Sequence, residues 1–170
     1  MLQITPLAPI PADAVEALLD RAFGADRRQR TAYRIRGGAT ALPALSFAAL
    51  DDGALIGTVQ CWPVAMRLDA GGVVPLVMVG PIAVAPERQR GGLGRQLVAR
   101  ALAAAAETGL DRAMMLIGDP EYYGRFFGFS AERTGDWRAP GPIERHRLLA
   151  RGPLVPDAPG LLGECAEPSG

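Results

Sequence analysis

The sequence predicts an α/β fold in which a mostly antiparallel sheet is flanked by helices. Helical segments with apolar residues at regular spacing, at 12–23 and 92–108, enclose a block of apolar, strand-like runs between 45 and 84. Inside that block, an Asp-Gly pair at 52–53 and a Gly-rich turn at 70–72 mark the tight connections that antiparallel neighbours use. The expected order is a strand, two helices, three strands, a helix, a strand, a helix and a strand.

The first part of the chain is expected to hold one strand and two helices. Residues 2–7 form a short apolar run typical of a strand. Residues 12–23 follow a proline, which suits the first turn of a helix, and place apolar side chains on one face. Residues 26–37 are rich in arginine and predict a second helix, with Asp26 as its candidate N-cap and Gly37 as its end.

The longest apolar run, residues 73–84, predicts a central strand that is buried on both faces. Gly80-Pro81 interrupts this run. Because proline has no N–H to donate to a neighbouring strand, we expect a bulge or a splay there. Residues 92–108 predict the clearest helix of the chain, and Gly109 follows it as a C-cap.

The remainder of the chain alternates short elements and ends in a segment rich in proline and glycine. Residues 113–117 predict a buried strand, 121–127 a short helix, and 128–130 the start of another strand. The last segment is expected to wrap loosely or to be partly disordered. We therefore divide the chain into a single domain over 1–152 and a tail over 153–170.

Composition and charge narrow the class of protein. The chain of 170 residues has 18 basic and 18 acidic side chains, so no net field favours nucleic acid or an anionic membrane. No apolar run has the length of a membrane span, and the N-terminus lacks a signal-peptide pattern. We expect a cytoplasmic protein with no nucleic-acid or membrane partner, whose Cys61 and Cys165 are free thiols.

A Gly-rich loop after the long apolar strand is the strongest functional signal. The loop is Gln89-Arg90-Gly91-Gly92-Leu93-Gly94, and it opens the helix over 92–108. The first N–H groups of a helix have no partners within it, and the helix dipole adds to their attraction for anions. Its glycines let phosphate oxygens approach the backbone, and Arg90 and Arg95 supply donors. A plain strand-to-helix turn uses the same glycines, but the combination with the arginines favours a phosphate site.

The loop differs from two common nucleotide-binding motifs. It lacks the Gly-Lys-Ser/Thr ending of a Walker A loop. It also departs from the pattern G-x-G-x-x-G, because Leu97 stands where that pattern needs a small residue. A nucleotide-binding domain of another class is therefore the weakest of the functional hypotheses.

The stretch from residue 79 to residue 94 resembles the acetyl-CoA-binding motif of the GNAT superfamily of N-acetyltransferases. The family pattern [QR]-x-x-G-x-[GA] is met by Gln89, Gly92 and Gly94. Downstream, Leu116-x-Gly118-Asp119-Pro120-x-Tyr122-Tyr123 and Gly128-Phe129 resemble the next strand and the tyrosine-bearing helix, in the form "GDPxYYxRFGF" found in small bacterial acetyltransferases. The resemblance covers about 45–130 and implies a sheet that is splayed at its central strand and has helices on both faces.

Two departures from the family affect the interpretation of individual residues. The family places glycine and then a basic residue before the central glycine, whereas this chain has Arg90 and then Gly91. The segment from Arg125 to Gly128 is one residue longer than the short form of the signature. The first departure leaves open which arginine meets a phosphate, and the second leaves open which tyrosine matches the family's tyrosine.

The resemblance implies acetyl-CoA as cosubstrate and no metal ion. The positions that match the family's cofactor contacts are Ile82, Ala83, Val84, Gln89, Arg90, Gly91, Gly92, Leu93, Gly94, Arg95 and Phe126. It implies that a strand amide, of Ile82 or Val84, polarises the thioester carbonyl. It also implies direct attack by an amine, with Tyr123 as the acid that protonates the leaving thiolate and Tyr122 as the alternative.

Several features of the implied reaction stay open at the level of sequence. The base is Asp119, His146 or a relayed water, although capping and surface roles explain the two side chains equally well. The acceptor is an amine of a small molecule or a peptide, and the protein is a monomer or a homodimer. The arginine-rich segment 26–37 suits an acidic acceptor or an ordinary solvated face. The alternative function is a catalytically silent acyl-CoA-binding sensor or interaction module.

Overall fold

The computed structural model describes residues 1–165, and within them eight strands form one sheet. The strand order is β1-β2-β3-β4-β5-β7, and β8 pairs with both β3 and β6. The pairings of β4 with β5 and of β6 with β8 are parallel, whereas β1–β2, β2–β3, β3–β8 and β5–β7 are antiparallel. The prediction of an α/β fold with a mostly antiparallel sheet is therefore confirmed.

The elements follow the chain in this order: β1 (Leu2–Pro6), α1 (Ala12–Phe23), η1 (Arg27–Gln29), α2 (Thr31–Arg36), η2 (Pro43–Leu45), β2 (Phe47–Asp51), β3 (Ala54–Leu68), β4 (Val73–Val84), η3 (Pro86–Arg88), α3 (Leu93–Thr108), β5 (Met114–Ile117), α4 (Pro120–Phe127), β6 (Trp137–Arg138), η4 (Arg145–Arg147), β7 (Leu148–Arg151) and β8 (Gly160–Glu164). The η elements are short 3₁₀ turns. No helix within residues 1–165 is long and apolar enough to cross a membrane.

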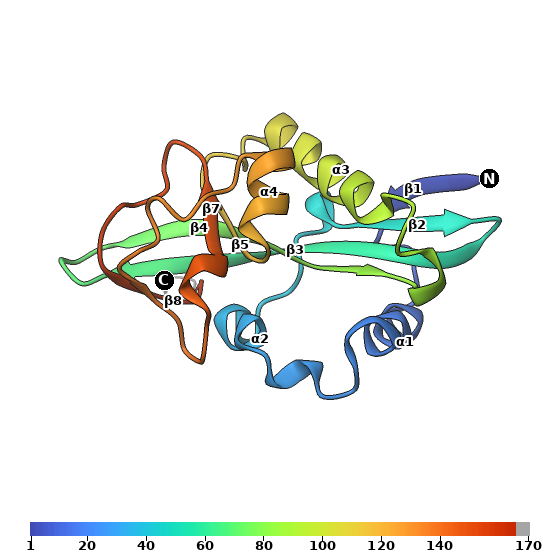
Figure 1. Ribbon diagram of the computed structural model, residues 1–170, viewed down its shortest axis with the longest axis horizontal. Coiled ribbons are helices and arrows are strands. Elements are labelled where there is room, and N and C mark those ends of the chain that lie inside the picture. The colour runs from blue at the N-terminus through green and yellow to red at the C-terminus, as the bar shows by residue number, and fades with distance from the viewer. Residues whose placement is uncertain (166–170) are drawn as a thin grey trace. The chain divides into compact units, whose positions relative to one another are not determined.

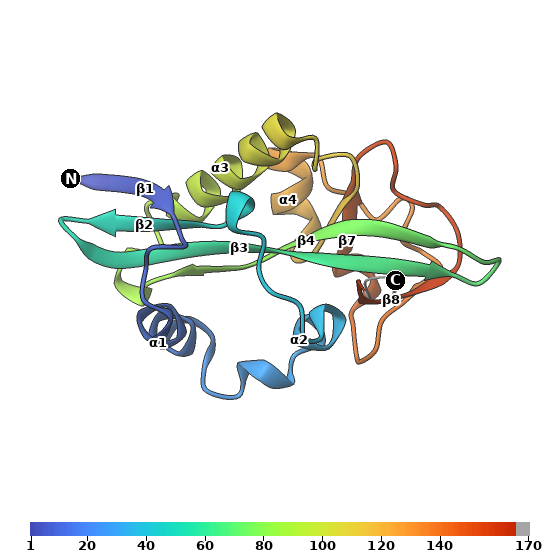
Figure 2. The same cartoon turned by 180° about the vertical axis from the view of Figure 1, so that it is seen from behind.

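The chain forms two compact units, and the long strands β3 and β4 contribute a part to each. The first unit consists of Met1–Arg28, Ala41–Cys61 and Val79–Thr108, and the second of Gln29–Thr40, Trp62–Met78 and Gly109–Gly170. Each unit places helices on both faces of its own strands, as Figures 1 and 2 show: α1 and α3 in the first, α2 and α4 in the second.

In the first unit, α3 packs against β2, β3 and β4 through a continuous apolar face. The buried residues of α3 recur at helical spacing and are Leu93, Leu97, Val98, Ala101, Ala104 and Ala105. Gly57 of β3 allows this close packing, since a Cβ at that position would lie 3.0 Å from the Leu97 side chain and 3.2 Å from the Ala83 carbonyl oxygen. The predicted helix over 92–108 and its C-cap Gly109, with φ +74°, are confirmed to within one residue.

In the second unit, the core surrounds Trp137, which is fully buried on β6. Its indole Nε1–H donates to the carbonyl of Pro156 at 3.1 Å, which satisfies the one polar atom of the ring. The strand β5 contributes Met114 and Met115 to the same core. This unit therefore joins strands from the middle of the chain to a segment near its end.

The arginine-rich segment 26–37 does not form one helix, and that prediction is wrong. It divides into η1 and the short helix α2, and the extended residue Arg30 holds the N-cap position that we had assigned to Asp26. The break follows from Arg27, whose side chain is 1% exposed and bonds the carboxylates of Asp20 and Glu16 on α1. A buried guanidinium needs such partners, because an unpaired charge away from water is strongly destabilising. Gly37 ends α2 as expected.

Two expectations for the last third of the chain are also wrong. Residues 128–130 begin no strand, because Ser130 makes only a single bridge to Ala150 before the chain turns away. The tail is not loose over Gly160–Glu164, which forms β8 and pairs with Val64–Leu68 of β3. Leu162 is completely buried there, and this burial outweighs the proline and glycine content on which the expectation rested. Residues 166–170 of the predicted tail lie outside the described residues.

The central strand β4 changes its environment along its length. It is buried from Leu76 to Val79, whereas Val73 is exposed, so burial on both faces holds only for its middle. Its parallel pairing with β5 covers Val77 and Met78 and ends there. The peptide bond between Gly80 and Pro81 is cis and immediately follows that end. The splay that we expected at this proline is thus present on the β5 side.

The two cysteines are free, as expected, but differ in environment, and this difference predicts their reactivity. Burial raises the pKa of the Cys61 thiol to about 12, whereas Cys165 is partly exposed. Because the thiolate is the reactive form, we expect an aromatic disulfide reagent at about pH 8 to modify only Cys165 in the folded protein. Absorbance will report one thiol before and two after unfolding in guanidinium, and Cys165→Ser is the matched control. A second rapid thiol in the folded protein would contradict the burial of Cys61.

Candidate functional site

The C-terminal end of β4 presents backbone groups at the edge opposite β3. The N–H of Ala85 donates to the Ile56 carbonyl on β3 at 2.8 Å, and the Ala83 carbonyl lies against Gly57 of the same strand. Because successive residues of a strand direct their peptide groups to opposite edges, those of Ile82 and Val84 face away from β3. The side-chain amide of Gln89 donates to the Val84 carbonyl at 3.5 Å, which agrees with this orientation.

The loop that follows this strand ends in the N-terminus of α3. Gly92 has φ +75° and accepts the N–H of Gln96 at 3.1 Å, so it is the residue that opens the helix. Leu93 is buried and anchors the first turn, whereas Gly91 and Gly92 are exposed. Gly94 lies over the Ile82 and Val84 side chains, with both Cγ2 atoms 3.7 Å from an ideal Cβ position. The structure therefore brings the predicted loop and the predicted strand residues together.

Two ion pairs hold the turn η3, which connects β4 to the loop. Arg88 bonds Asp51 at the end of β2 at 2.7 Å, and Nη2 of Arg21 on α1 donates to both carboxylate oxygens of Glu87, at 2.9 and 3.0 Å. The Arg88 guanidinium holds the pKa of Asp51 below its usual value. Sequence reasoning missed these residues because each partner lies far away along the chain. The exposed Arg90 and Arg95 belong to the loop itself.

In the second unit, the Gly-Asp-Pro segment ends β5 and starts α4. Asp119 is the N-cap, and its Oδ1 accepts the N–H of Glu121 at 3.0 Å, with Pro120 at the first helical position. A Cβ on Gly118 would lie 2.5 Å from Cε2 of Tyr123, so only glycine lets that ring lie directly on the chain. The segment thus fixes both the start of the helix and the position of the phenol.

The predicted acid, Tyr123, carries a protonated phenol over the whole physiological range. Burial, followed by the neighbouring Tyr122, raises its pKa to about 12. Tyr122 packs edge-on against it, with ring centroids 4.9 Å apart, and contacts Phe126 at 5.3 Å. Phe126 is 40% exposed. In its protonated state the Tyr123 hydroxyl is able to donate a hydrogen bond.

The two side chains that we weighed as the base have other roles in the structure. Asp119 caps α4, as described above. His146 lies 3.5 Å from Glu144, and both side chains are about two-thirds exposed, which is an ordinary surface pair. On α2, the Arg36 guanidinium lies 3.8 Å from the ring centroids of both Tyr33 and Trp62. The arginine-rich segment is therefore not a uniform solvated face.

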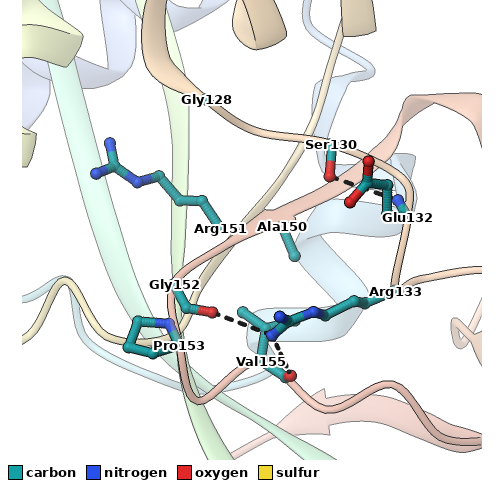
Figure 3. Close-up of a pocket in the computed structure, with 9 residues that line it drawn as sticks. All are labelled: Gly128, Ser130, Glu132, Arg133, Ala150, Arg151, Gly152, Pro153 and Val155. Atoms are coloured by element: carbon teal, nitrogen blue, oxygen red, sulfur yellow. Dashed lines mark hydrogen bonds between the residues drawn. The ribbon is translucent and has the colours of Figure 1, made fainter.

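A polar hollow of about 310 Å³ lies in the second unit, and none of the predicted site residues lines it. Figure 3 shows Arg133 reaching across it to the carbonyls of Gly152 and Val155, at 3.5 and 3.2 Å. Arg151 donates to the carbonyl of Phe127 at 3.1 Å. Both arginines hydrogen-bond backbone carbonyls, so they hold the segments around the hollow together. No cluster of three or more metal-binding side chains occurs among residues 1–165.

The mixed sheet, the glycine loop before α3 and the tyrosine-bearing helix after Gly-Asp-Pro are the features on which the resemblance to an acetyltransferase rests. The chain belongs to the GNAT acetyltransferase family, since the model of the acetyltransferase (GNAT) domain matches residues 4–131. It is similar to YhbS of Escherichia coli strain K12, an uncharacterized N-acetyltransferase, with 35% identity over 147 residues, 82% of this chain and 83% of the relative.

Two solved structures of the family share this fold. The structure of E. coli YhbS in complex with CoA has a TM-score of 0.65 and 30% identity, and covers 89% of this chain and 79% of that one. A GNAT acetyltransferase from Brucella melitensis in complex with acetyl-CoA has a TM-score of 0.59 and 26% identity, and covers 89% of this chain and 96% of that one. The resemblance to this family is thus confirmed, and the roles of individual site residues remain proposals.

The conformation of Gly92 predicts a difference between two neighbouring glycines. An alanine at Gly92 has to adopt φ near +75°, which costs roughly 1 kcal/mol, whereas Gly91 has an ordinary backbone with its nearest neighbour 3.9 Å from a Cβ. We expect Gly92→Ala to lower the free energy of unfolding by about that amount and Gly91→Ala to leave it nearly unchanged. Urea unfolding without ligand is the measurement. Equal losses in both variants would show that the loop has a different conformation.

Proposed function

We propose that this protein transfers the acetyl group of acetyl-CoA to an amine by direct attack. The observation that carries the proposal is the end of β4, where the backbone groups of Ile82 and Val84 face away from β3 beside a helix N-terminus. Such an edge suits an extended amide-bearing arm, and the adjacent helix N-terminus suits the phosphates at the end of that arm. CoA has this combination of groups.

Acetyl-CoA would use the two parts of this site for different groups. The pyrophosphate would accept hydrogen bonds from the N–H groups of Gly91, Gly92, Leu93 and Gly94, with Gln89, Arg90 and Arg95 at the margin. The pantetheine arm would lie along Ile82–Val84, and Phe126 would add apolar contact. The complexes of the E. coli relative with CoA and of the Brucella protein with acetyl-CoA support acetyl-CoA as the cosubstrate.

The chemistry follows from the groups that the chain offers. An N–H of Ile82 or Val84 would stabilise the oxyanion that forms when the neutral amine attacks the thioester carbonyl. The fully buried Cys61, with its pKa of about 12, is unsuited to form an acyl-enzyme. Tyr123, or Tyr122 in its place, would protonate the leaving thiolate. Since Asp119 caps α4 and His146 is a surface residue, a relayed water is the base.

The acceptor in this proposal is an amine of a small molecule or a peptide, and the enzyme works as a monomer or a homodimer in the cytoplasm. One observation favours the alternative of a silent acyl-CoA-binding module. A phenol with a pKa of about 12 is a much weaker acid than a thiol, whose pKa is about 8.5, so proton transfer to the thiolate needs further help. Binding and turnover therefore have to be tested separately.

Ligand binding is expected to raise the melting temperature in a defined order. Acetyl-CoA and CoA should each stabilise the protein, because both carry the pyrophosphate and the pantetheine arm, and ATP should do so much less. At a concentration of about 100 Kd, a ligand adds roughly 2.7 kcal/mol to the free energy of unfolding. Arg90→Gln should weaken the response, with Arg112→Gln, on the loop before β5, as the charge-matched control. A response to ATP alone would overturn the proposal.

The tyrosines are tested by turnover with a panel of amines. We expect Tyr123→Phe to lower kcat roughly 100-fold with little change in the KM for acetyl-CoA, because the hydroxyl acts in the transition state. Since the phenol has a pKa of about 12, it stays protonated below that value. The kcat of the unmodified protein should therefore show no decrease near pH 10 that can be assigned to Tyr123. Tyr122→Phe is the matched comparison. Unchanged turnover in Tyr123→Phe excludes this residue, and a loss confined to Tyr122→Phe assigns the role to Tyr122.

A further inference from the structure

Arg147 lies directly opposite Gly118, at the point where β5 ends. The antiparallel register of β5 and β7 pairs Ile117 with Leu148. The N–H of Gly118 then donates to the Arg147 carbonyl at 2.9 Å, which continues the same pairing by one residue. Arg147 is the last residue of η4, and its side chain is exposed. The backbone of Arg147 is therefore fixed by the sheet, while its side chain has no structural role in that pairing.

The side chain of Arg147 leaves the sheet on the face where Tyr123 lies. Residues directly opposite one another in an antiparallel pair direct their Cβ atoms to the same face. At Gly118 that face is covered by the Tyr123 ring, which is why a Cβ there would lie 2.5 Å from Cε2. The Cβ of Arg147 and the ring of Tyr123 therefore lie on the same face of the sheet, beside a residue that has no side chain.

The charges around the Tyr123 phenol support this placement. Burial, Tyr122 and Asp119 all raise its pKa, and Arg147 opposes them by lowering it. The other polar side chains of η4 are engaged elsewhere: Arg145 donates to the carbonyls of Gly135 and Trp137, and His146 lies beside Glu144. Arg147 is thus the cation of this element that acts on the phenol.

We propose that the Arg147 guanidinium stabilises the negative charge that Tyr123 acquires when its proton passes to the CoA sulfur. This inference rests on the proposed transfer reaction and adds a residue that acts through Tyr123. In the step, the phenolic O–H bond breaks and an S–H bond forms, so the thiolate becomes the free thiol and Tyr123 becomes a phenolate. The acylated amine then loses its extra proton, which returns to the phenolate through water. The cation thereby reduces the mismatch in acidity between a buried phenol and a thiol.

Steady-state kinetics test the inference through charge and coupling. We expect Arg147→Gln to lower kcat roughly tenfold, the equivalent of about one pKa unit at Tyr123, with an unchanged KM for acetyl-CoA. Arg147→Lys keeps the charge and should recover most of the loss, while Arg112→Gln controls for net charge. If Arg147 acts through Tyr123, Arg147→Gln should have no further effect in a Tyr123→Phe background. An equal loss in both backgrounds would overturn the inference.

A titration of Tyr123 decides the point without turnover. The chain has three tyrosines, so the double variant Tyr33→Phe, Tyr122→Phe leaves Tyr123 as its one tyrosine. Incorporation of a fluorinated tyrosine, which is more acidic, brings the ionisation of Tyr123 into the pH range in which the protein stays folded. We expect Arg147→Gln to raise the midpoint seen by ¹⁹F NMR and Arg112→Gln to leave it unchanged. An unchanged midpoint in Arg147→Gln refutes the role of Arg147. Failure of every amine to be acetylated would instead refute the proposed function, and the titration would still report on Arg147.

Discussion

The different lengths over which β4 pairs with its two neighbours are the constraint on which the rest of the site depends. On one side β4 follows β3 to its end, and Ala85 still donates to Ile56. On the other side its pairing with β5 ends at Met78. A strand that loses one neighbour leaves half of its peptide groups without a strand partner, and such groups bind side chains, water or ligands instead. For this strand we propose that the pantetheine arm of acetyl-CoA is that group.

The loop after β4 is positioned by interactions on both of its sides. The ion pairs of Arg88 with Asp51 and of Glu87 with Arg21 tie η3 to β2 and α1, and the buried Leu93 fixes the first turn of α3. Exposed ion pairs contribute little to stability individually. Their value here is geometric, because they hold the helix N-terminus at a constant place relative to Ile82 and Val84. A preorganised site of this kind binds its ligand without the entropic cost of ordering a loop.

Tyr123 shows how packing and charge compete at one group. The absence of a side chain at Gly118 lets the ring lie on the chain, and that burial raises the pKa of the phenol. Arg147, opposite Gly118, acts in the other direction. The same local geometry therefore both buries the phenol and places near it a cation that opposes the effect of burial on its pKa. The family resemblance points to this tyrosine, whereas the groups that raise and lower its pKa are found from the structure of this chain.

The sequence by itself determined the features whose signals are local. The apolar spacing of 93–108, the glycine loop with Gln89, the turn at 52–53 and the Gly-Asp-Pro start of α4 all lie within a few consecutive residues, and all are present in the structure. The family followed from these motifs and their separation. Intrinsic propensities and short patterns were sufficient there, because each element forms mainly through contacts within a few positions of itself.

Only the tertiary structure decided the features that need distant partners. Arg27 turned inward and broke the predicted helix because Glu16 and Asp20 on α1 face it. The segment Gly160–Glu164 became a strand because the edge of β3 and the buried position of Leu162 were available to it. Arg147 lies opposite Gly118, where it lowers the pKa of the Tyr123 phenol, because β7 returns antiparallel to β5. In each case the free energy comes from burying or pairing groups far apart in the chain, and no local pattern of residues records which groups will meet.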